Sequence, residues 1–399
     1  MIDINTITDP KQIKLNELTP QEITIIDARL PGIIKQLREK FYQIERLDLM
    51  QATYNIIIGQ RSNGKTFAVC RKIVDEYIET GTASAYIRRF DETLKTKNIE
   101  TLFDPHIVYV EKMTGKWNKV IYRNYAFYFG VEQDGKIIKR DSKPFCRCYS
   151  LNSGETTNGA DRGEVKYILF DEFVTRKFYL QNEFILLQNK LSTIIRSREN
   201  VIIYMVANTV NKYCPYFKEM GLHKVAKQPK GTIDLYTMGK TQTKIAVEYC
   251  EKAGISQESE HYFCFDNPEI NMITSGDWEI SLYRHIKKGV SDIPPELTFF
   301  IYFDDNIIKG DIKIVNDAPI ICFEPKTTEI KDPENTIIYF DETDDPNPLH
   351  QTEIKYTGTR AHEIILTLIR QHKTYFATNE CGEMFANWLK KSGKGVYTV

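Results

Sequence analysis

The chain has 399 residues, a formal net charge of −1 and a hydrophobic content of 42%. Its length allows two or three domains with sizeable cores, and its balanced charge excludes a uniformly basic nucleic-acid-binding protein. No apolar stretch is long enough to cross a bilayer, and the N-terminus lacks a signal-peptide pattern, so we expect a cytosolic protein that binds no membrane. The eight cysteines are scattered and are expected to be buried, reduced thiols.

Residues 1–50 are predicted to form an N-terminal helical extension. The stretch "TPQEITIIDARLPGIIKQLREKFYQIERLDLM" is typical of helix and precedes the first motif that carries chemistry. We expect the extension to dock on the domain that follows it or on a neighbouring molecule.

A phosphate-binding loop is predicted at residues 59–66. An apolar strand over 55–58 leads into it, and apolar residues at helical spacing follow it until Gly81, which is placed to end the helix. The loop matches G-x-x-x-x-G-K-[ST] without a mismatch. The predicted nucleotide-binding residues are Gly59, Gln60, Arg61, Ser62, Asn63, Gly64, Lys65 and Thr66.

Strand, glycine loop and helix are the parts that a phosphate cradle needs. Backbone N–H groups and the helix N-terminus attract the phosphates, Lys65 reaches the β- and γ-phosphates, and the hydroxyl of Thr66 binds Mg²⁺. The alternative is a tight surface turn that happens to carry Lys-Thr, and it does not account for the flanking strand and helix. ATP and Mg²⁺ are therefore the expected ligands.

Short strand patterns fill the segment 100–160, in which Asp134-Gly135 is a two-residue turn signal. We expect a β-hairpin inserted ahead of the next motif.

An acidic pair follows the apolar run over 167–170. Asp171 is placed to hold Mg²⁺ through water, and Glu172 is placed to take a proton from the attacking water. "QNKL", "VNKY" and "WNKV" all lack the aspartate of a guanine-reading Asn-Lys-x-Asp segment. The sequence therefore favours ATP hydrolysis coupled to mechanical work.

Two further candidate groups lie on the next elements. A helical pattern over 184–195 leaves Arg196 and Arg198 at its exposed end, where they either pair with the helix dipole or reach a neighbouring subunit's γ-phosphate. The apolar strand over 201–206 turns polar at Asn208, which either contacts the γ-phosphate or belongs to an ordinary turn. The patterns alone leave both alternatives open.

A linker or lid subdomain is predicted over 222–285. It contains a lysine cluster, which is typical of a solvated face and has a phosphate-facing role as its alternative. The lysines are Lys224, Lys227, Lys230, Lys240 and Lys244. From 286 onward strand and turn patterns alternate, and helical patterns follow in "AHEIILTLIRQH" and "GEMFANWLKK".

The motifs "GQRSNGKT", "AYIRRFDE", "ILFDEF" and "LSTIIRSRENVIIYMVANTVNKYCPYF", in that order, resemble the DNA-packaging (encapsidation) ATPases of small protein-primed podophages. These are relatives of the terminase large subunits, and the similarity covers about residues 50–220. It implies a ring ATPase, expected to be a pentamer, which docks on the portal of an empty procapsid in the host cytoplasm and pushes double-stranded DNA inward. A structural RNA is a further candidate partner.

The resemblance also assigns roles. Arg61 matches an arginine that these enzymes keep within the loop, Asn208 falls on the coupling position, and Arg196 aligns with the trans-acting finger, with Arg198 as the fallback. Together with the motifs, this gives Glu172, Lys65, Arg196 and Asn208 as the predicted catalytic residues. The predicted metal-binding residues are Thr66 and Asp171.

The same resemblance implies an RNase-H-like C-terminal domain that has lost its active site. Nuclease chemistry needs several carboxylates around two metal ions. The acids in this part of the chain fall in predicted turns rather than inside apolar strands, so we expect no nuclease activity. They are Asp304, Asp305, Asp311, Asp341, Glu342, Asp344 and Asp345.

The expected fold is α/β. A P-loop NTPase core of the ASCE type, with a mostly parallel sheet flanked by helices, spans 51–221, the linker or lid spans 222–285, and an α+β nuclease-like domain spans 286–399. The expected function is an ATP-hydrolysing motor subunit that moves viral DNA into a procapsid. The alternatives are a terminase large subunit with an active nuclease, or a nucleotide-gated phage assembly or DNA-binding protein that moves nothing.

Overall fold

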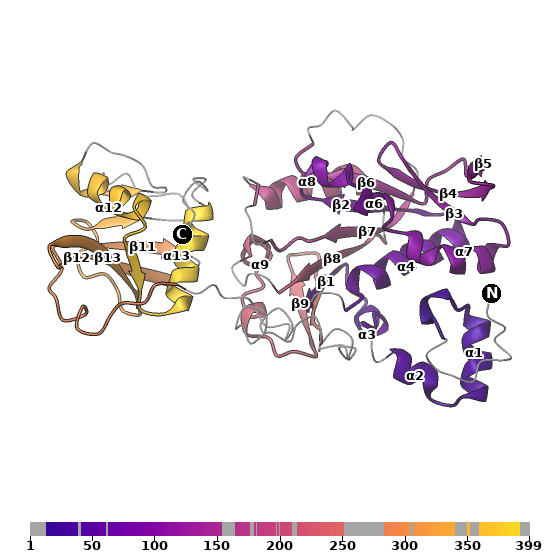
Figure 1. Cartoon of the computed structure of the whole chain (residues 1–399), viewed down its shortest axis with the longest axis horizontal. Helices are drawn as coiled ribbons and strands as arrows, with labels where there is room; N and C mark the ends of the chain where they lie inside the picture. The colour runs from indigo at the N-terminus through magenta and orange to yellow at the C-terminus, as the bar shows by residue number, and fades with distance from the viewer. Residues whose placement is uncertain are drawn as a thin grey trace. The chain divides into compact units, whose positions relative to one another are not determined.

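The structure is a computed structural model, which describes residues 13–38, 41–60, 63–153, 164–175, 179–180, 182–196, 198, 200–209, 214–250, 283–303, 306–339, 349–351 and 359–391. These residues divide into two compact units (Figure 1). The first unit holds the described residues up to 174, with 182–209 and 222–250, and the second holds the remainder. Within the described ranges no helix combines the length and apolar character that a membrane crossing needs.

A ten-stranded sheet forms the centre of the first unit. Its order is β3-β4-β6-β2-β7-β8-β1-β10-β9, with β5 paired to β4, and all neighbours from β6 to β10 along this order are parallel. The strands are β1 Tyr54–Gly59, β2 Ala83–Arg88, β3 Lys119–Arg123, β4 Ala126–Gln133, β5 Lys136–Arg140, β6 Cys146–Ser150, β7 Val165–Asp171, β8 Ile202–Asn208, β9 Thr232–Met238 and β10 Thr243–Tyr249.

The strand order brings the predicted motifs to one edge of the sheet. β8 lies between β1, which ends at Gly59, and β7, which ends at Asp171. In register, Gly59 lies beside Asn208, and Asp171 lies beside Val206. An added strand between the phosphate-loop strand and the acidic strand defines the ASCE type, so the predicted fold class is confirmed. Because the carboxyl ends of parallel strands meet at one edge, this edge is where ligands bind in such folds.

Both faces of the parallel strands are covered. Ile56, Ile57 and Ile58 of β1 have no exposed surface, which explains why this strand is an unbroken apolar run. The helices α4 Lys65–Thr80 and α7 Ile107–Thr114 cover one face, and α8 Glu183–Ile195 lies on the other (Figure 1). The helix α4 ends where Gly81 adopts a left-handed conformation, with φ 73°, as the sequence predicts.

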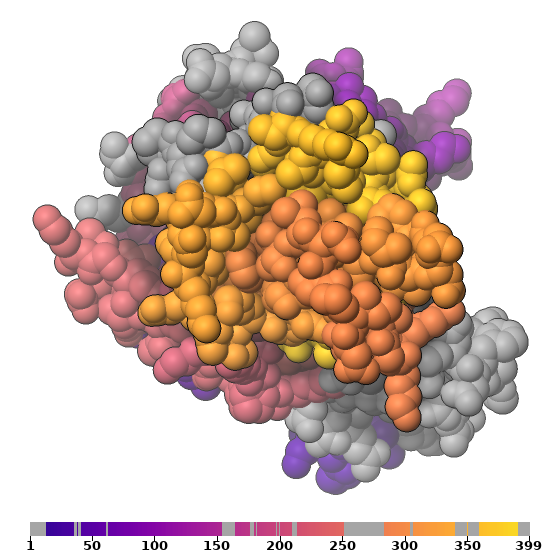
Figure 2. Space-filling view, turned by 90° about the vertical axis from the view of Figure 1, so that its left-hand side faces the viewer, coloured from indigo at the N-terminus to yellow at the C-terminus, as the bar shows by residue number. Residues whose placement is uncertain are grey.

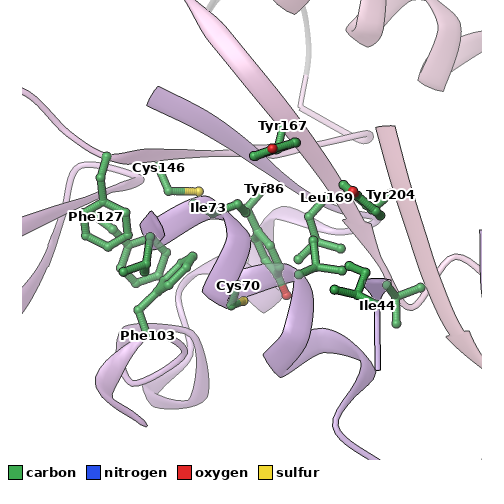
Figure 3. Close-up of a cluster of buried hydrophobic side chains, with 14 of the residues drawn as sticks. Ile44, Cys70, Ile73, Tyr86, Phe103, Phe127, Cys146, Tyr167, Leu169 and Tyr204 are labelled. Atoms are coloured by element: carbon green, nitrogen blue, oxygen red, sulfur yellow. The ribbon is translucent and has the colours of Figure 1, made fainter. Parts of the chain in front are cut away.

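The core under α4 mixes aliphatic and aromatic side chains (Figure 3). Cys70 and Ile73 of α4 face Tyr86, Leu169 and Tyr204, which come from β2, β7 and β8. Complete burial of each large apolar side chain stabilises the fold by about 1.5–3 kcal/mol relative to exposure. This packing fixes the start of α4, and with it the phosphate loop, against the strands that carry the acidic pair.

The predicted N-terminal extension is helical in its described part. It comprises η3 Leu15–Glu17, α1 Pro20–Arg29, α2 Ile33–Arg38 and α3 Glu45–Asp48. A capping box between Thr19 and Glu22 starts α1. The extension packs on the rest of the first unit, because Lys112 pairs with Glu22 at 2.9 Å and Arg71 donates to the backbone oxygen of Asn16 at 2.5 Å.

The predicted hairpin is confirmed. β4 and β5 pair antiparallel, and Asp134 and Gly135 form the two-residue turn, with φ 52° and 74°. A second, unpredicted hairpin joins β3 to β4 through Asn124 and Tyr125, which also have positive φ. The short elements of this unit are α5 Asp91–Leu94, α6 Lys97–Glu100, η4 Asp104–His106 and η6 Val225–Lys227.

The structure differs from the lid predicted over 222–285. The strand β10 pairs parallel with β1, and β9 pairs antiparallel with β10, so residues 232–249 extend the ATPase sheet instead of forming a separate subdomain. The reason is that the apolar residues of β10 complete the burial of β1. Lys224, Lys227, Lys240 and Lys244 are exposed, as a solvated face requires. Residues 251–282 lie outside the described part.

The second unit contains a six-stranded sheet of order β15-β14-β11-β12-β13-β16. β11, β12 and β13 form an antiparallel meander, β14 and β15 add in parallel on the other side of β11, and β16 pairs parallel with β13. Its elements are α9 Pro215–Glu219, β11 Leu297–Phe303, β12 Asn306–Val315, β13 Ala318–Lys326, β14 Ile337–Tyr339, β15 His350–Gln351, α12 Arg360–Arg370, β16 Thr374–Phe376 and α13 Asn379–Lys391.

One apolar core joins this sheet to its two long helices. Ile365 of α12 and Phe385 of α13 are completely buried with Phe299 and Phe323 of the sheet. Figure 2 shows the strand residues in orange and the helical residues in yellow forming one continuous surface of this unit. The cysteines within the described residues are all buried and free, as predicted.

Candidate nucleotide-binding site

The phosphate loop joins β1 to α4 through two glycines that the backbone geometry requires. Gly64 adopts a left-handed conformation, with φ 90°, directly before the helix. Gly59 has φ 153°, and a Cβ added there would lie 2.9 Å from Cβ of Cys250, closer than carbon atoms pack. Both positions therefore exclude a larger residue and allow the chain to turn tightly at the end of β1.

A pocket of about 280 Å³ lies at the carboxyl edge of the sheet. It brings together side chains that are far apart in sequence but belong to the predicted motifs. The lining residues are Asn63, Gly64, Lys65, Thr66, Phe67, Asp171, Glu172, Val206, Ala207 and Asn208. A concave site with a glycine loop and a helix N-terminus at its base is suited to a polyphosphate.

Lys65 is buried, with 4% of its surface exposed, and its ammonium group is held by the loop itself. Nζ donates to Oδ1 of Asn63 at 3.0 Å and to the backbone oxygen of Gly59 at 3.3 Å, with a further short contact to the backbone oxygen of Gln60. Burial lowers the pKa of Lys65 to about 8, and the negative charge of Asp171 partly opposes this effect. The loop thus holds a cation ready for an anionic ligand.

Asp171 lies at the end of β7, with both carboxylate oxygens occupied by hydrogen bonds. Thr66 donates to Oδ1 at 3.2 Å, while Tyr86 and Arg88 donate to Oδ2 at 2.9 Å and 3.1 Å. The predicted metal-binding residues, Thr66 and Asp171, are therefore adjacent. A threonine hydroxyl beside a carboxylate is the oxygen donor set that Mg²⁺ prefers in phosphate sites.

Glu172 faces the mouth of the same pocket, with 60% of its side chain exposed. Its Oε2 accepts from Nη2 of Arg88 at 2.5 Å, so a single guanidinium binds both members of the acidic pair. The backbone of Glu172 is left-handed, with φ 57°, which is uncommon for a residue other than glycine. The carboxylate thus lies at the mouth of the pocket and is held there by an ion pair.

Asn208 ends β8 and lines the pocket beside the phosphate loop. Its Oδ1 accepts from Nζ of Lys65 at 3.4 Å, and the next residue, Thr209, donates its N–H to the oxygen of Gly59 at 3.2 Å. The structure therefore places Asn208 in contact with the loop lysine.

The two candidate arginines lie at the end of α8. Arg196 is the C-cap residue, exposed and left-handed, with φ 44°. Arg198 is partly buried, and its Nη1 donates to the backbone oxygen of Ile194 at 2.9 Å. Neither lines the pocket of its own chain. The predicted loop residues Arg61 and Ser62 lie outside the described part of the chain. The Oε1 of Gln60 is buried and has no hydrogen-bond partner among the described residues.

Sequence reasoning missed the second layer of the site. Tyr86, Arg88 and Arg89 come from β2 and the position after it, and all contact residues 171–173. Tyr42, from the end of the N-terminal extension, donates its N–H to the loop oxygen of Asn63 at 2.8 Å. Two consecutive arginines at the end of a buried strand are the one sequence signal that could have indicated these contacts.

The turn position predicted for Asp311 is wrong. Asp311 lies inside β12 and is 3% exposed. Thr298 donates to its Oδ1 at 2.7 Å, and Lys309 pairs with its Oδ2 at 2.6 Å, so the strand context and these partners hold it in place. The other six acids named for the C-terminal domain lie outside the described residues, and within the described ones no group of three metal-binding side chains occurs.

The sheet order, the glycine loop and the paired acids define a P-loop NTPase of the ASCE class. The family model of the podovirus DNA encapsidation protein (Gp16) matches residues 37–236, half of the chain. The chain therefore belongs to the podovirus DNA encapsidation (Gp16) family, and the resemblance found in the motifs is confirmed.

Individual relatives are more distant. The DNA packaging protein of Bacillus phage B103 is 26% identical over 171 residues, which are 42% of this chain and 48% of that protein. The DNA packaging protein of Bacillus phage phi29 is 26% identical over 185 residues, or 44% and 49%. The chain thus aligns with about half the length of these curated relatives. The bacteriophage Phi-29 genome packaging motor assembly has a TM-score of 0.54 at 17% identity, covering 88% of this chain and 99% of that one, which shows the shared fold.

Proposed function

We propose that the chain is an ATP-hydrolysing motor subunit that translocates double-stranded viral DNA into a preformed procapsid. The observation that carries this proposal is the convergence of Lys65, Thr66, Asp171, Glu172 and Asn208 on one pocket. The names of the two curated relatives, both DNA packaging proteins, also support the proposal.

The pocket residues fit ATP with Mg²⁺. Lys65 and the backbone of the loop are suited to the β- and γ-phosphates, and Thr66 and Asp171 to the metal ion. Mg²⁺, when bound, neutralises charge on the phosphates. Glu172 is the candidate base that takes a proton from water, and Asn208 contacts Lys65, through which it can sense whether a phosphate has engaged the lysine.

Arg88 imposes a condition on this chemistry. While its guanidinium pairs with Glu172 at 2.5 Å, the carboxylate oxygen that accepts from Arg88 is not available to a water molecule. Hydrolysis therefore requires Glu172 to leave Arg88 and turn into the pocket. The 60% exposure of the Glu172 side chain leaves room for that rotation.

The remaining parts of the proposal concern partners. We place the chain in the host cytoplasm, attached transiently to the portal of the procapsid as a ring of copies, with five as the expected number and a structural RNA as a candidate component. Arg196 is exposed at the end of α8 and does not line its own pocket, which suits a residue that reaches the nucleotide of a neighbour. The exposed lysines of the 224–244 segment are candidate contacts to DNA phosphates.

We further propose that the second unit has no nuclease activity. The resemblance implies a nuclease-like fold for this unit, but the buried Asp311 is neutralised by Lys309 and hydrogen bonded to Thr298. Nuclease chemistry needs several carboxylates around two metal ions, and Asp311 would have to exchange both of these partners to take part. Incubating the full chain with plasmid and Mn²⁺ tests this, and cleavage that is lost in Asp311→Asn would overturn it.

Packaging itself is tested with procapsids, linear duplex DNA and ATP. We expect wild-type chain to move DNA into a DNase-resistant state, and Lys65→Ala to move none. Mixtures of the two chains test whether subunits are coupled. If subunits act independently, packaging activity falls in proportion to the fraction of Lys65→Ala chains, and in a coupled ring it falls more steeply. DNA protection that needs no ATP would contradict the proposal.

A further inference from the structure

Arg88 is the last residue of β2 and Arg89 follows it. Both bind Glu172, but through different groups of that residue. Because successive side chains along a strand point to opposite sides, Arg88 reaches the carboxylate of Glu172 and Arg89 reaches its main chain. Nη1 of Arg89 donates to the backbone oxygen of Glu172 at 3.1 Å, and Nη2 donates to that of Phe173 at 2.6 Å.

The third side of the Arg89 guanidinium faces α8. Its Nε donates to the two carboxylate oxygens of Glu183 at 2.8 Å and 3.0 Å, and both residues are almost completely buried, at 6% and 3% exposed. Glu183 is the first residue of α8, and Arg196 caps its other end. A buried charge pair of this kind is costly to break, so it fixes the geometry of every group it touches.

The hydrogen bonds from Arg89 matter because the backbone conformation of Glu172 determines where its carboxylate lies. A φ of 57° is rarely adopted by residues other than glycine, and it sets the direction in which the carboxylate leaves the main chain. The hydrogen bond from Arg89 to the Glu172 oxygen and the bond from the Phe173 N–H to the oxygen of Val206 at 3.4 Å hold the backbone on either side of this position.

We infer that Arg89 is a positioning residue for the candidate base Glu172 and that it ties this backbone, through Glu183, to the helix whose far end carries Arg196. The inference rests on the proposed ATPase function. The helix α8 has 13 residues, roughly 20 Å at 1.5 Å per residue, and a rigid helix of that length transmits a shift from one end to the other. The orientation of Glu172 in one subunit thus depends on what Arg196 contacts on the next.

The test compares Arg89→Lys and Glu183→Gln with wild type. Lysine keeps the positive charge beside Glu183 but cannot donate to the carboxylate and both carbonyls at once. We expect kcat to fall by about 10–100-fold in Arg89→Lys while KM and the affinity for a fluorescent ATP analogue stay within about twofold, because Arg89 does not line the pocket. Glu22→Gln, which breaks the distant ion pair to Lys112, is the matched control and should leave kcat unchanged.

Coupling along α8 is tested by a double-mutant cycle. If Glu183 and Arg196 are coupled through α8, Arg196→Ala lowers kcat less in the Glu183→Gln background than in wild type. If the factor by which Arg196→Ala lowers kcat is the same in both backgrounds, the coupling is refuted. Hydrogen exchange without nucleotide provides a readout independent of hydrolysis. The amides of residues 172–174 should exchange faster in Arg89→Lys and in Glu183→Gln than in Glu22→Gln.

The outcomes separate the two proposals. A wild-type chain that binds and hydrolyses no ATP refutes the proposed function, and the exchange measurement then still decides whether Arg89 fixes this backbone. A wild-type chain that hydrolyses ATP, with Arg89→Lys equally active or weakened in affinity and kcat alike, refutes only the role of Arg89.

Discussion

The hydroxyl of Thr66 donates a hydrogen bond to Oδ1 of Asp171 at 3.2 Å, across 105 residues of sequence. This contact joins the start of α4 to the end of β7. The other oxygen of Asp171 accepts from Tyr86 and Arg88, so protein donors occupy the carboxylate that a metal ion is expected to approach. Metal binding must therefore compete with Arg88.

This competition can be measured with Arg88→Met. Removing one partner of a pair whose side chains are 14% and 11% exposed should lower the free energy of unfolding by about 2–4 kcal/mol without metal. The increase in thermal stability on adding Mg²⁺ should be larger than in wild type, because no cation then opposes the ion at Asp171. Lys72→Met, which removes the ion pair to Asp48, serves as a control and should respond to Mg²⁺ as wild type does. Equal increments in all three proteins would contradict the competition.

The affinity for ATP should depend on the protonation of Lys65. Its pKa without ligand is lowered to about 8 by burial, whereas phosphates favour the charged ammonium and raise the pKa in the complex. The free site is therefore protonated at pH 7, and above pH 8 binding must take up a proton. We expect constant affinity between pH 7 and 7.5, then a loss that approaches tenfold per pH unit above 8. Titration with a fluorescent ATP analogue checks this, and affinity that is flat to pH 10 would disagree.

Lys65 also affects stability, with the opposite sign. Its pKa in the folded chain, about 8, lies below the ordinary lysine value of 10.5, so the unfolded chain binds more protons between these two values. The contribution of Lys65 to the free energy of unfolding therefore rises with pH from about 8 to 10.5. Below pH 8 its destabilising effect is fully present. Denaturant titrations of wild type and Lys65→Met over this range should show the rise only in wild type.

Gly59 should tolerate no side chain unless its neighbour becomes smaller. A Cβ at this position would lie 2.9 Å from Cβ of Cys250, so Gly59→Ala should cost about 1–3 kcal/mol through overpacking and strain. Cys250→Gly in the same chain removes the clashing atom and should recover part of the loss. Gly81→Ala, at φ 73° with nothing within 4 Å of the added Cβ, shows what a positive φ costs without a steric clash. Denaturant titration of wild type, Gly59→Ala, Cys250→Gly and the double variant completes the cycle, and a loss from Gly59→Ala that is as large in the Cys250→Gly background as in wild type would rule out the contact as the cause.

Complementation distinguishes Arg196 from Arg198. If Arg196 acts on a neighbour's nucleotide, mixing Arg196→Ala chains with Glu172→Gln chains, each of which hydrolyses ATP slowly alone, raises activity at interfaces where a Glu172→Gln chain supplies the arginine. Arg198→Ala should retain activity in isolation, because Arg198 binds the backbone oxygen of Ile194 in its own helix. The measurement is phosphate release on procapsids. Restoration with Arg198→Ala in place of Arg196→Ala would reverse the assignment.

The parts of the site that could be predicted are those encoded locally. The glycine loop, the strand that ends in Asp171 and the strand that ends in Asn208 each lie within a short run of residues, where apolar periodicity and turn residues specify the element. Because parallel strands share one carboxyl edge, the convergence of the three also follows from the sequence.

The contacts that could not be predicted depend on pairing between distant segments. Nothing around β10 indicates that it completes β1, since its apolar run is short and its lysine-rich flanks are typical of a surface segment. Arg88 and Arg89 acquire their roles only when β2 lies beside β7. Gly310 before Asp311 predicts a turn, whereas tertiary packing extends β12 through both residues.

The central claim is that the pocket between Lys65 and the acidic pair binds ATP and that Glu172 activates water there. Its most direct test is a single-turnover measurement on the full chain with procapsids, DNA and radiolabelled ATP, comparing wild type with Glu172→Gln. We predict that Glu172→Gln retains one unhydrolysed ATP per chain with affinity near that of wild type, while its hydrolysis rate is lower by about 10²–10⁴-fold. Hydrolysis by Glu172→Gln at the wild-type rate, or the absence of bound nucleotide in both proteins, would contradict the account.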